Sequence, residues 1–220
     1  MKNGRENMTK IKQNKITVYF KYIVITLLVS MVLFGAIIFY NINRLASSEG
    51  EQVVYSNELY TLRGKPTVLQ KSLFKELTEH VKSGDELAIV ESVVRNFVAD
   101  YYTWTNKQGP FDVGGTEYIF YRENTNFRQN ARRYHYTFMY PLIESGLTFA
   151  DLVEVESVMT NGAAYAAAFD HYGEKYTTFY CEISWTYKAN EKLDLSIFPT
   201  SAAFTIVKTN DNRYEIVRFY

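Results

Sequence analysis

The most apolar part of the sequence pattern is residues 22–40, YIVITLLVSMVLFGAIIFY, which contain no charged side chain. At roughly 1.5 Å per residue a helix of this length is about 28 Å long, close to the ~30 Å hydrocarbon core of a bilayer. The run therefore predicts a single transmembrane helix. Six basic side chains precede it and only Arg44 follows closely; the six are Lys2, Arg5, Lys10, Lys12, Lys15 and Lys21. This bias predicts that residues 1–21 are a basic cytoplasmic tail and that the carboxyl-terminal domain is extracytoplasmic.

A cleaved signal peptide is the alternative interpretation of the amino-terminal region, because Ala46, Ser47 and Ser48 offer small residues at a possible cleavage site. The apolar region is longer than the usual ~7–15 residues of a signal peptide, which favours a permanent anchor in the cell membrane. Residues 41–65 show no clear period and are predicted to be a connector. The folded domain is then expected to span residues 66–220.

Apolar positions at helical spacing predict two helices at the start of this domain. Thr67 and Gln70 have the spacing of a capping box, and an apolar stripe follows at Leu69, Leu73, Leu77 and Val81. Ser83 and Glu86 repeat the capping spacing before a predicted helix of about 20 residues, whose apolar stripe is formed by Leu87, Val90, Val94, Phe97 and Tyr101. Glu91 and Arg95 are four residues apart on the opposite side, which predicts a surface ion pair within this helix.

A third helix is predicted from about Thr125, followed by a change to strand spacing. Phe127, Ala131, Tyr134 and Phe138 form its apolar stripe, and Pro141 is expected to kink or end it. From Asp151 the apolar period falls to two, most clearly where Phe179, Cys181, Ile183, Trp185 and Tyr187 alternate with polar residues. Weaker alternation predicts strands in 151–160 and 201–208, and the NDN at 210–212 predicts a closing hairpin. The run AAYAAAF at 163–169 permits either a helix or a strand, and the flanking glycines favour the strand.

Helices followed by four or five antiparallel strands predict an α+β domain with about three helices on one face of a curved sheet. This order of elements resembles the nuclear transport factor 2-like fold, a cone in which a bent sheet wraps a long helix. With the basic tail and the single span, the chain is similar to the bitopic membrane subunit of type IV secretion and conjugative transfer systems. Many gram-negative members carry an Asn-Pro-x-Gly turn before a late strand. FPTSAAFTI at 198–206 keeps the proline and lacks that motif, which fits a divergent gram-positive member.

The charge distribution and the reactive residues limit the chemistry that the sequence supports. Residues 45–220 hold 17 basic and 23 acidic side chains, which argues against general nucleic-acid binding. No spacing among His80, His135 and His171 suits a metal, and the chain has no phosphate-binding glycine loop with a lysine, so neither a metal nor a cofactor is predicted. Cys181, the only cysteine, is expected to be an inert core residue between Phe179 and Ile183.

Two sets of residues are candidates for a site. Arg122, Arg128, Arg132 and Arg133 are the only local basic cluster beyond the predicted span, and they suit either a solvated helix face or a docking patch for an acidic partner, lipid headgroups or DNA in transit. The second set has the residue types of an aromatic pocket with an acidic base, although an aromatic core would explain the tyrosines equally; it consists of Asp100, Tyr101, Tyr102, Tyr136 and Asp170.

The resemblance implies a non-enzymatic scaffold of a type IV secretion or conjugative channel, which acts by protein-protein contacts. Its expected partners are other channel subunits, weakly associated copies of itself, and the bilayer through residues 22–40. The alternative is a membrane-tethered domain of the same fold that binds or converts a small ligand.

Overall fold

The computed structural model describes residues 30–31 and 55–220. Residues 52–220 form one compact unit of the chain, and the fold below is that of its described part. Except for Ser30 and Met31, the predicted span at residues 22–40 lies outside the described residues. Within the described part of the chain, no helix is both long enough and apolar enough to cross a bilayer.

The first two helices form where the apolar stripes predicted them. Helix α2 (Val68–Ser83) begins with the predicted capping box, in which Thr67 and Gln70 satisfy each other's backbone amides. Helix α3 (Glu86–Tyr101) is capped by Asp85, whose carboxylate accepts a hydrogen bond from the amide of Ala88, so the expected Ser83 cap is wrong. Ser83 instead belongs to the last turn of α2. Helix α3 is the central helix of the fold, and Val90, Val94 and Phe97 of the predicted stripe are fully buried.

The predicted ion pair within α3 is also wrong, because both partners contact other elements. Arg95 pairs with Glu76 of α2 at 2.5 Å. Glu91 accepts hydrogen bonds from the Thr160 hydroxyl and the Ala163 amide of the sheet, each at 3.0 Å. The two side chains therefore join α3 to its neighbours on either side.

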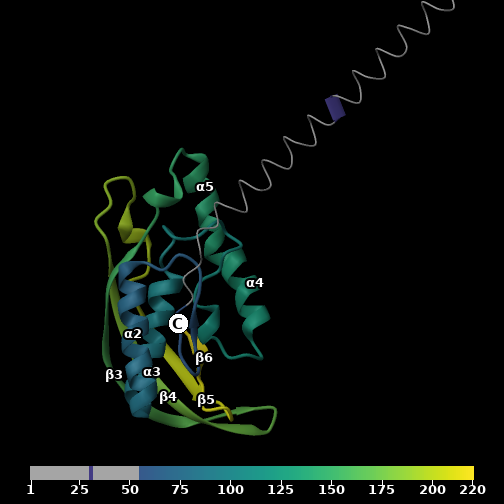
Figure 1. Ribbon diagram of the computed structural model, residues 1–220, viewed down its shortest axis with the longest axis vertical. Coiled ribbons are helices and arrows are strands. Elements are labelled where there is room, and N and C mark those ends of the chain that lie inside the picture. The colour runs from purple at the N-terminus through teal and green to yellow at the C-terminus, as the bar shows by residue number, and fades with distance from the viewer. Residues whose placement is uncertain (1–29, 32–54) are drawn as a thin grey trace, which may run out of the picture. The chain divides into compact units, whose positions relative to one another are not determined.

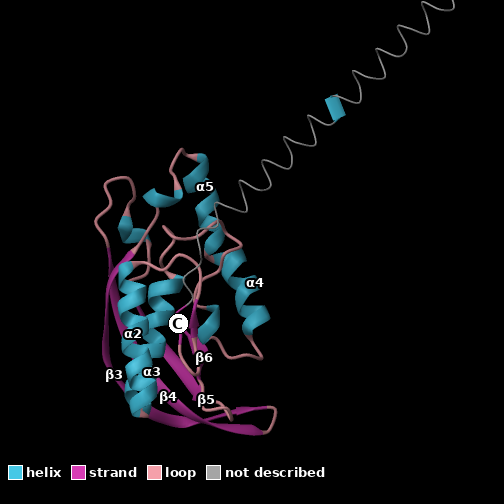
Figure 2. Cartoon of the chain, viewed as in Figure 1, coloured by secondary structure: helices cyan, strands magenta, loops and turns pink. Residues whose placement is uncertain are grey.

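Four antiparallel strands follow the helices in simple sequential order: β3 (Val155–His171), β4 (Glu174–Tyr187), β5 (Ser201–Lys208) and β6 (Tyr214–Phe219). The α+β class and the four-stranded sheet are as predicted. Helix α3 packs on this sheet, and α2 lies beside α3 (Figures 1 and 2). The alternation in β4 is confirmed, because Phe179, Cys181, Ile183, Trp185 and Tyr187 are all buried.

Strand β3 is longer than expected, because the two predicted segments, residues 151–160 and 163–169, join into one strand that begins at Val155. Three shifts in its register with β4 allow this 17-residue strand to bend, and one of them surrounds Gly162, which has φ of 95°. The alanine-rich run is therefore a strand. Glycine tolerates this left-handed backbone better than any other residue, which accounts for its place at the bulge.

The third helical region differs most from the prediction. Helix α4 (Asn124–Tyr134) ends before Pro141, and a 3-10 turn (Tyr136–Phe138) leads into the short helix α5 (Met139–Glu144), which contains that proline near its start. Of the predicted stripe only Ala131 is buried, whereas Tyr134 and Phe138 are 64% and 58% exposed. Helix α4 therefore has a narrow buried face and a wide exposed one.

The folded domain begins earlier than the predicted boundary at Pro66. Strands β1 (Tyr55–Ser56) and β2 (Thr61–Leu62) pair with each other, and Tyr60 and Leu62 belong to the core. The last residues of the predicted connector, 55–65, are thus part of the fold. Its aromatic and apolar side chains are buried by contacts that a search for local periodicity does not detect.

Candidate functional site

A polar cleft of about 800 Å³ opens on the surface of the domain. Its walls are the β2–α2 loop, the loop after α3, the 3-10 helix η1 (Thr116–Tyr118), one face of α4, and the β5–β6 hairpin. This volume is in the range of sites for small ligands, but charged and polar side chains line much of the cleft, whereas most such sites are apolar.

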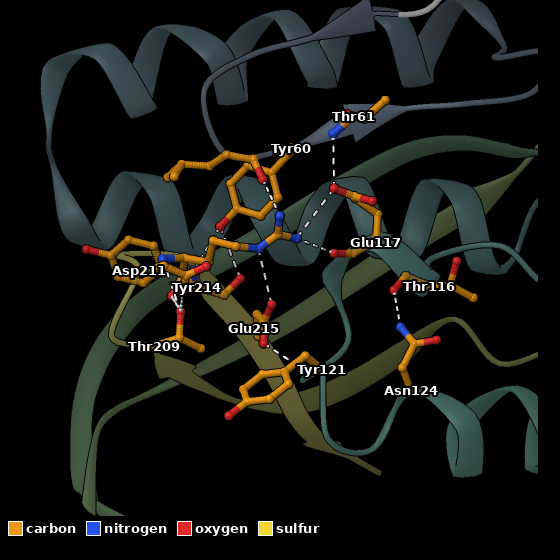
Figure 3. Close-up of polar contacts among 12 residues, drawn as sticks. Tyr60, Thr61, Thr116, Glu117, Tyr121, Asn124, Thr209, Asp211, Tyr214 and Glu215 are labelled. Carbon is orange, nitrogen blue, oxygen red and sulfur yellow. Dashed lines mark hydrogen bonds and ion pairs between the residues drawn. The ribbon is translucent and has the colours of Figure 1, made fainter.

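Arg213 of the β5–β6 hairpin joins this hairpin to η1 and to the turn between β1 and β2. Its guanidinium donates to the Leu59 carbonyl, to the Glu117 carbonyl and carboxylate at 2.9 and 3.4 Å, and to the Glu215 carboxylate at 3.1 Å. Figure 3 shows Glu117 to the right of this network and Glu215 below it. The guanidinium also lies 5.0 Å from the ring centre of Tyr60. With its donors used within the protein, Arg213 is a structural clamp of the cleft wall.

Glu215 is the most enclosed carboxylate of the cleft, with a side chain only 5% exposed. Burial raises its pKa, while the amide of Tyr121 at 3.0 Å and the guanidinium of Arg213 oppose that shift. The Tyr60 hydroxyl, deeper in the wall, donates to the Tyr214 carbonyl and accepts from the Tyr214 amide. The wall is therefore a preorganised hydrogen-bonded unit.

Asp100 forms the second anchored group of the cleft. It accepts hydrogen bonds from Lys107 and from the amide of Gly115, at 2.6 Å for the latter. At Gly114 a β-carbon would lie 2.2 Å from the backbone oxygen of Asp100, so only glycine permits this close approach. The Gly114-Gly115 pair thus shapes the loop that brings Lys107 onto Asp100.

The remaining basic side chains of the cleft have fewer partners within the protein than its carboxylates have. Asp112 accepts from the Gln108 amide and Asp211 from the Thr209 hydroxyl, so every lining carboxylate has an internal donor. Among the described residues, the side chains of Arg63, Lys65 and Arg128 have no hydrogen-bond or ion-pair partner. The cleft can therefore offer three cationic donors to a polar ligand that carries an acidic group.

The structure places the four arginines of the predicted docking patch in different surroundings. Arg122 pairs with Glu174 at 2.6 Å, and Arg128 lines the cleft. The guanidinium carbon of Arg132 lies 5.6 Å from the ring centre of Phe111, and that of Arg133 lies 5.3 Å from the ring centre of Tyr134. Arg128 and Arg132 are four residues apart in α4 and share a helix face, whereas Arg122 lies before that helix.

The second predicted set of residues does not form a pocket. Tyr101, Tyr102 and Tyr136 are buried in the core, where the Tyr136 hydroxyl donates to the Tyr101 carbonyl at 2.8 Å and accepts from the Gly114 amide. Burial raises the pKa of each of these tyrosines. Asp170 lies near the end of β3, where it accepts a hydrogen bond from the Gly173 amide. Asp100 alone reaches a cavity, and there it holds the structure together.

The histidines and the cysteine occupy unrelated positions. His80 contacts Ser92 at 2.7 Å, His135 stacks on Tyr101 in the core, and His171 lies at the β3–β4 turn. Among the described residues no group of three or more metal-ligating side chains is close enough to hold an ion. Cys181 is buried, and burial raises the pKa of its thiol to about 12.

An exposed sheet edge is a feature that the sequence patterns did not single out. Strand β3 is the terminal strand of the sheet, and its stretch from Ser157 to Phe169 contains no charged residue. Most side chains of residues 161–168 are exposed, and Met159 and Tyr165 are 59% and 62% exposed. The uncharged alanine run was the available signal, but only the strand order shows that it lies on an edge.

Comparison of the chain with protein-family models, with curated proteins and with solved structures found no match. The function of the chain must therefore be argued from its own residues.

Proposed function

We propose that the chain is a membrane-anchored, non-enzymatic assembly component of a type IV secretion or conjugative DNA-transfer channel. The α+β architecture, with helices before a bent antiparallel sheet, supports a nuclear transport factor 2-like cone. The uncharged run at residues 22–40 and the lysines before it support the anchor. In this proposal the domain acts through contacts with other channel subunits and with copies of itself.

The observation that carries the proposal is the open edge of β3. Unpaired backbone groups on an edge strand are a template for another strand, and proteins usually protect them with charges, prolines or short strands. The stretch Ser157–Phe169 has neither a charge nor a proline. Glu91 occupies one edge amide, that of Ala163. A partner strand could add along the rest of this edge, with main-chain hydrogen bonds supplying affinity.

Charged substitutions on this edge test the contact directly. Ala164→Lys and Ala166→Lys place a lysine on exposed positions of the edge, where it should oppose pairing with a partner strand. Ser184→Lys is the matched control, because Ser184 is exposed on β4 and has β3 and β5 as neighbours on its two sides. In a host that lacks the gene, the two edge variants should fail to restore DNA transfer or secretion, whereas the control should restore it.

The anchor is tested in the same host. The full chain should restore transfer, and a chain without residues 1–44 should not. Protease added to intact protoplasts should remove an epitope at the carboxyl end and spare one at the amino end. Normal transfer in the deletion strain, or the reverse protease pattern, would contradict the proposal.

The polar cleft favours a second candidate function, the binding of a small acidic ligand. Citrate and pyrophosphate are suitable probes, because each carries several negative charges that could engage Arg63, Lys65 and Arg128 together. Saturable binding to residues 52–220 should be weakened by Arg128→Gln and unaffected by Arg133→Gln, which lies outside the cleft. Equal effects of the two substitutions would argue against a ligand site in the cleft.

A further inference from the structure

The surface of α4 and α5 differs in charge from the domain that carries it. Residues 55–220 hold 17 basic and 21 acidic side chains, a net charge of −4. Residues 124–143, which run from the start of α4 into α5, contain three arginines and no acidic residue. One segment of an acidic domain is therefore locally cationic.

Exposed aromatic side chains accompany these charges. Tyr134, Phe138 and Tyr140 are 64%, 58% and 46% exposed, and with Arg132 and Arg133 they make up what we call the α4–α5 surface. At about 100° per residue, positions 132 to 134 cover an arc of roughly 200°. Ala131, the buried residue of α4, lies outside that arc, so the arc faces solvent.

The two arginines of this surface keep most of their hydrogen-bonding capacity. Arg132 donates one bond, to the Phe111 carbonyl at 3.2 Å, and Arg133 donates none to a described residue. Among the residues that the structure describes, no carboxylate forms an ion pair with either guanidinium. Instead each lies beside an exposed aromatic ring, Phe111 for Arg132 and Tyr134 for Arg133, an arrangement that leaves its charge available to an anion.

We propose that the α4–α5 surface docks against an anionic lipid surface. Arginines bind the headgroup phosphates, and amphipathic aromatic side chains settle at the boundary between headgroups and acyl chains. This part of the inference rests on the predicted anchor: 14 residues, 41–54, separate the predicted span from the first described strand. Fully extended, these residues reach about 50 Å at most, so the domain stays near the bilayer. A weak intrinsic affinity for lipid is then sufficient for docking.

Vesicle binding by residues 52–220 tests the proposal without the anchor, since this unit has its own core. The fragment should co-sediment with vesicles of phosphatidylcholine mixed with phosphatidylglycerol, and not with phosphatidylcholine alone. Each of Arg132→Gln and Arg133→Gln should lower the partition coefficient roughly fivefold, the effect of one cation at an anionic surface. Phe138→Ser should also lower it. Added salt should weaken binding, because exposed charges are screened.

Arg122→Gln is the matched control, because it removes the same charge from an arginine that already pairs with Glu174. It should leave the partition coefficient unchanged within about twofold. An equal effect of Arg122→Gln and Arg133→Gln, equal binding to neutral vesicles, or no binding to either vesicle would overturn the proposal. The β3 edge variants separate the two proposals: loss of transfer with normal vesicle binding would support both the edge contact and this docking surface, whereas normal transfer with normal vesicle binding would contradict the edge contact alone.

Discussion

Replacing Arg213 with methionine should destabilise the domain mainly by isolating Glu215. The Glu215 side chain is 5% exposed and that of Arg213 is 24% exposed, so the pair is largely buried. Removing one partner of a buried ion pair typically costs about 3–5 kcal/mol, because the other charge remains without compensation. The carbonyls of Leu59 and Glu117 lose a donor as well, but the partial exposure of Arg213 allows water to replace it. The expected loss is therefore about 3–5 kcal/mol at pH 7.

The loss should depend on pH in a defined direction. Burial already raises the pKa of Glu215 above its usual 4.5, and Arg213 opposes this shift, so its removal should raise the pKa further. A carboxyl whose pKa is higher in the folded state binds its proton more tightly there, so the folded state gains relative stability as the pH falls. The difference between Arg213→Met and the parent should thus be largest near neutral pH and smaller near pH 5.

Urea denaturation of residues 52–220 at several pH values measures this difference. The double variant Arg213→Met, Glu215→Gln should recover part of the lost stability. Its stability should no longer show the pH dependence caused by Glu215, because the carboxyl at this position is gone. Arg122→Met is the control for an exposed pair and should lower the free energy of unfolding far less than Arg213→Met does. A loss below about 1 kcal/mol for Arg213→Met, or one that is constant with pH, would refute the reasoning.

Two further predictions concern the core. Phe97→Ala and Trp185→Ala should each lower the free energy of unfolding by about 3–5 kcal/mol, because both side chains are buried and Phe97 contacts rings of α3, α4, β5 and β6. Val68→Ala, at an 85% exposed position, should change it by less than about 0.5 kcal/mol in denaturation experiments, and similar values for all three variants would contradict the assigned core. Burial lowers the pKa of His135 to about 4, so the contribution of this residue to stability should be fully present above about pH 6.5 and lost as the pH falls from about 6.5 to 4. His135→Phe should flatten that part of the stability curve, and an unchanged slope would assign the acid sensitivity to other groups.

Local patterns predicted the elements whose determinants lie within a few residues. The capping box of Thr67 and Gln70 closes within one helical turn, and the stripe of α3 follows from helical geometry alone. The alternation from Phe179 to Tyr187 was equally reliable, because one face of β4 is buried along that stretch. These signals survive in the fold because tertiary contacts reinforce them.

Sequence-based predictions failed where another residue formed the contact that the local spacing had assigned. Arg95 is four residues from Glu91 but pairs with Glu76, since α2 packs beside α3 and offers a carboxylate at shorter range. Ser83 was preferred as a cap on spacing alone, although Asp85 lies next to the first turn of α3. In α4 the predicted apolar stripe assumed a partner layer over Tyr134 and Phe138, and the described fold places none there.

The sequence by itself determined the α+β class, the central helix, the hairpin at the carboxyl end and the burial of Cys181, because each depends on short-range periodicity or composition. Tertiary structure alone decided that Leu59, Glu117 and Arg213 meet in one wall of the cleft, since these residues are widely separated along the chain. It also decided that the alanine-rich run lies on the outer edge of the sheet. Strand order and loop closure follow from how the whole chain buries its apolar surface, and no short segment contains that information.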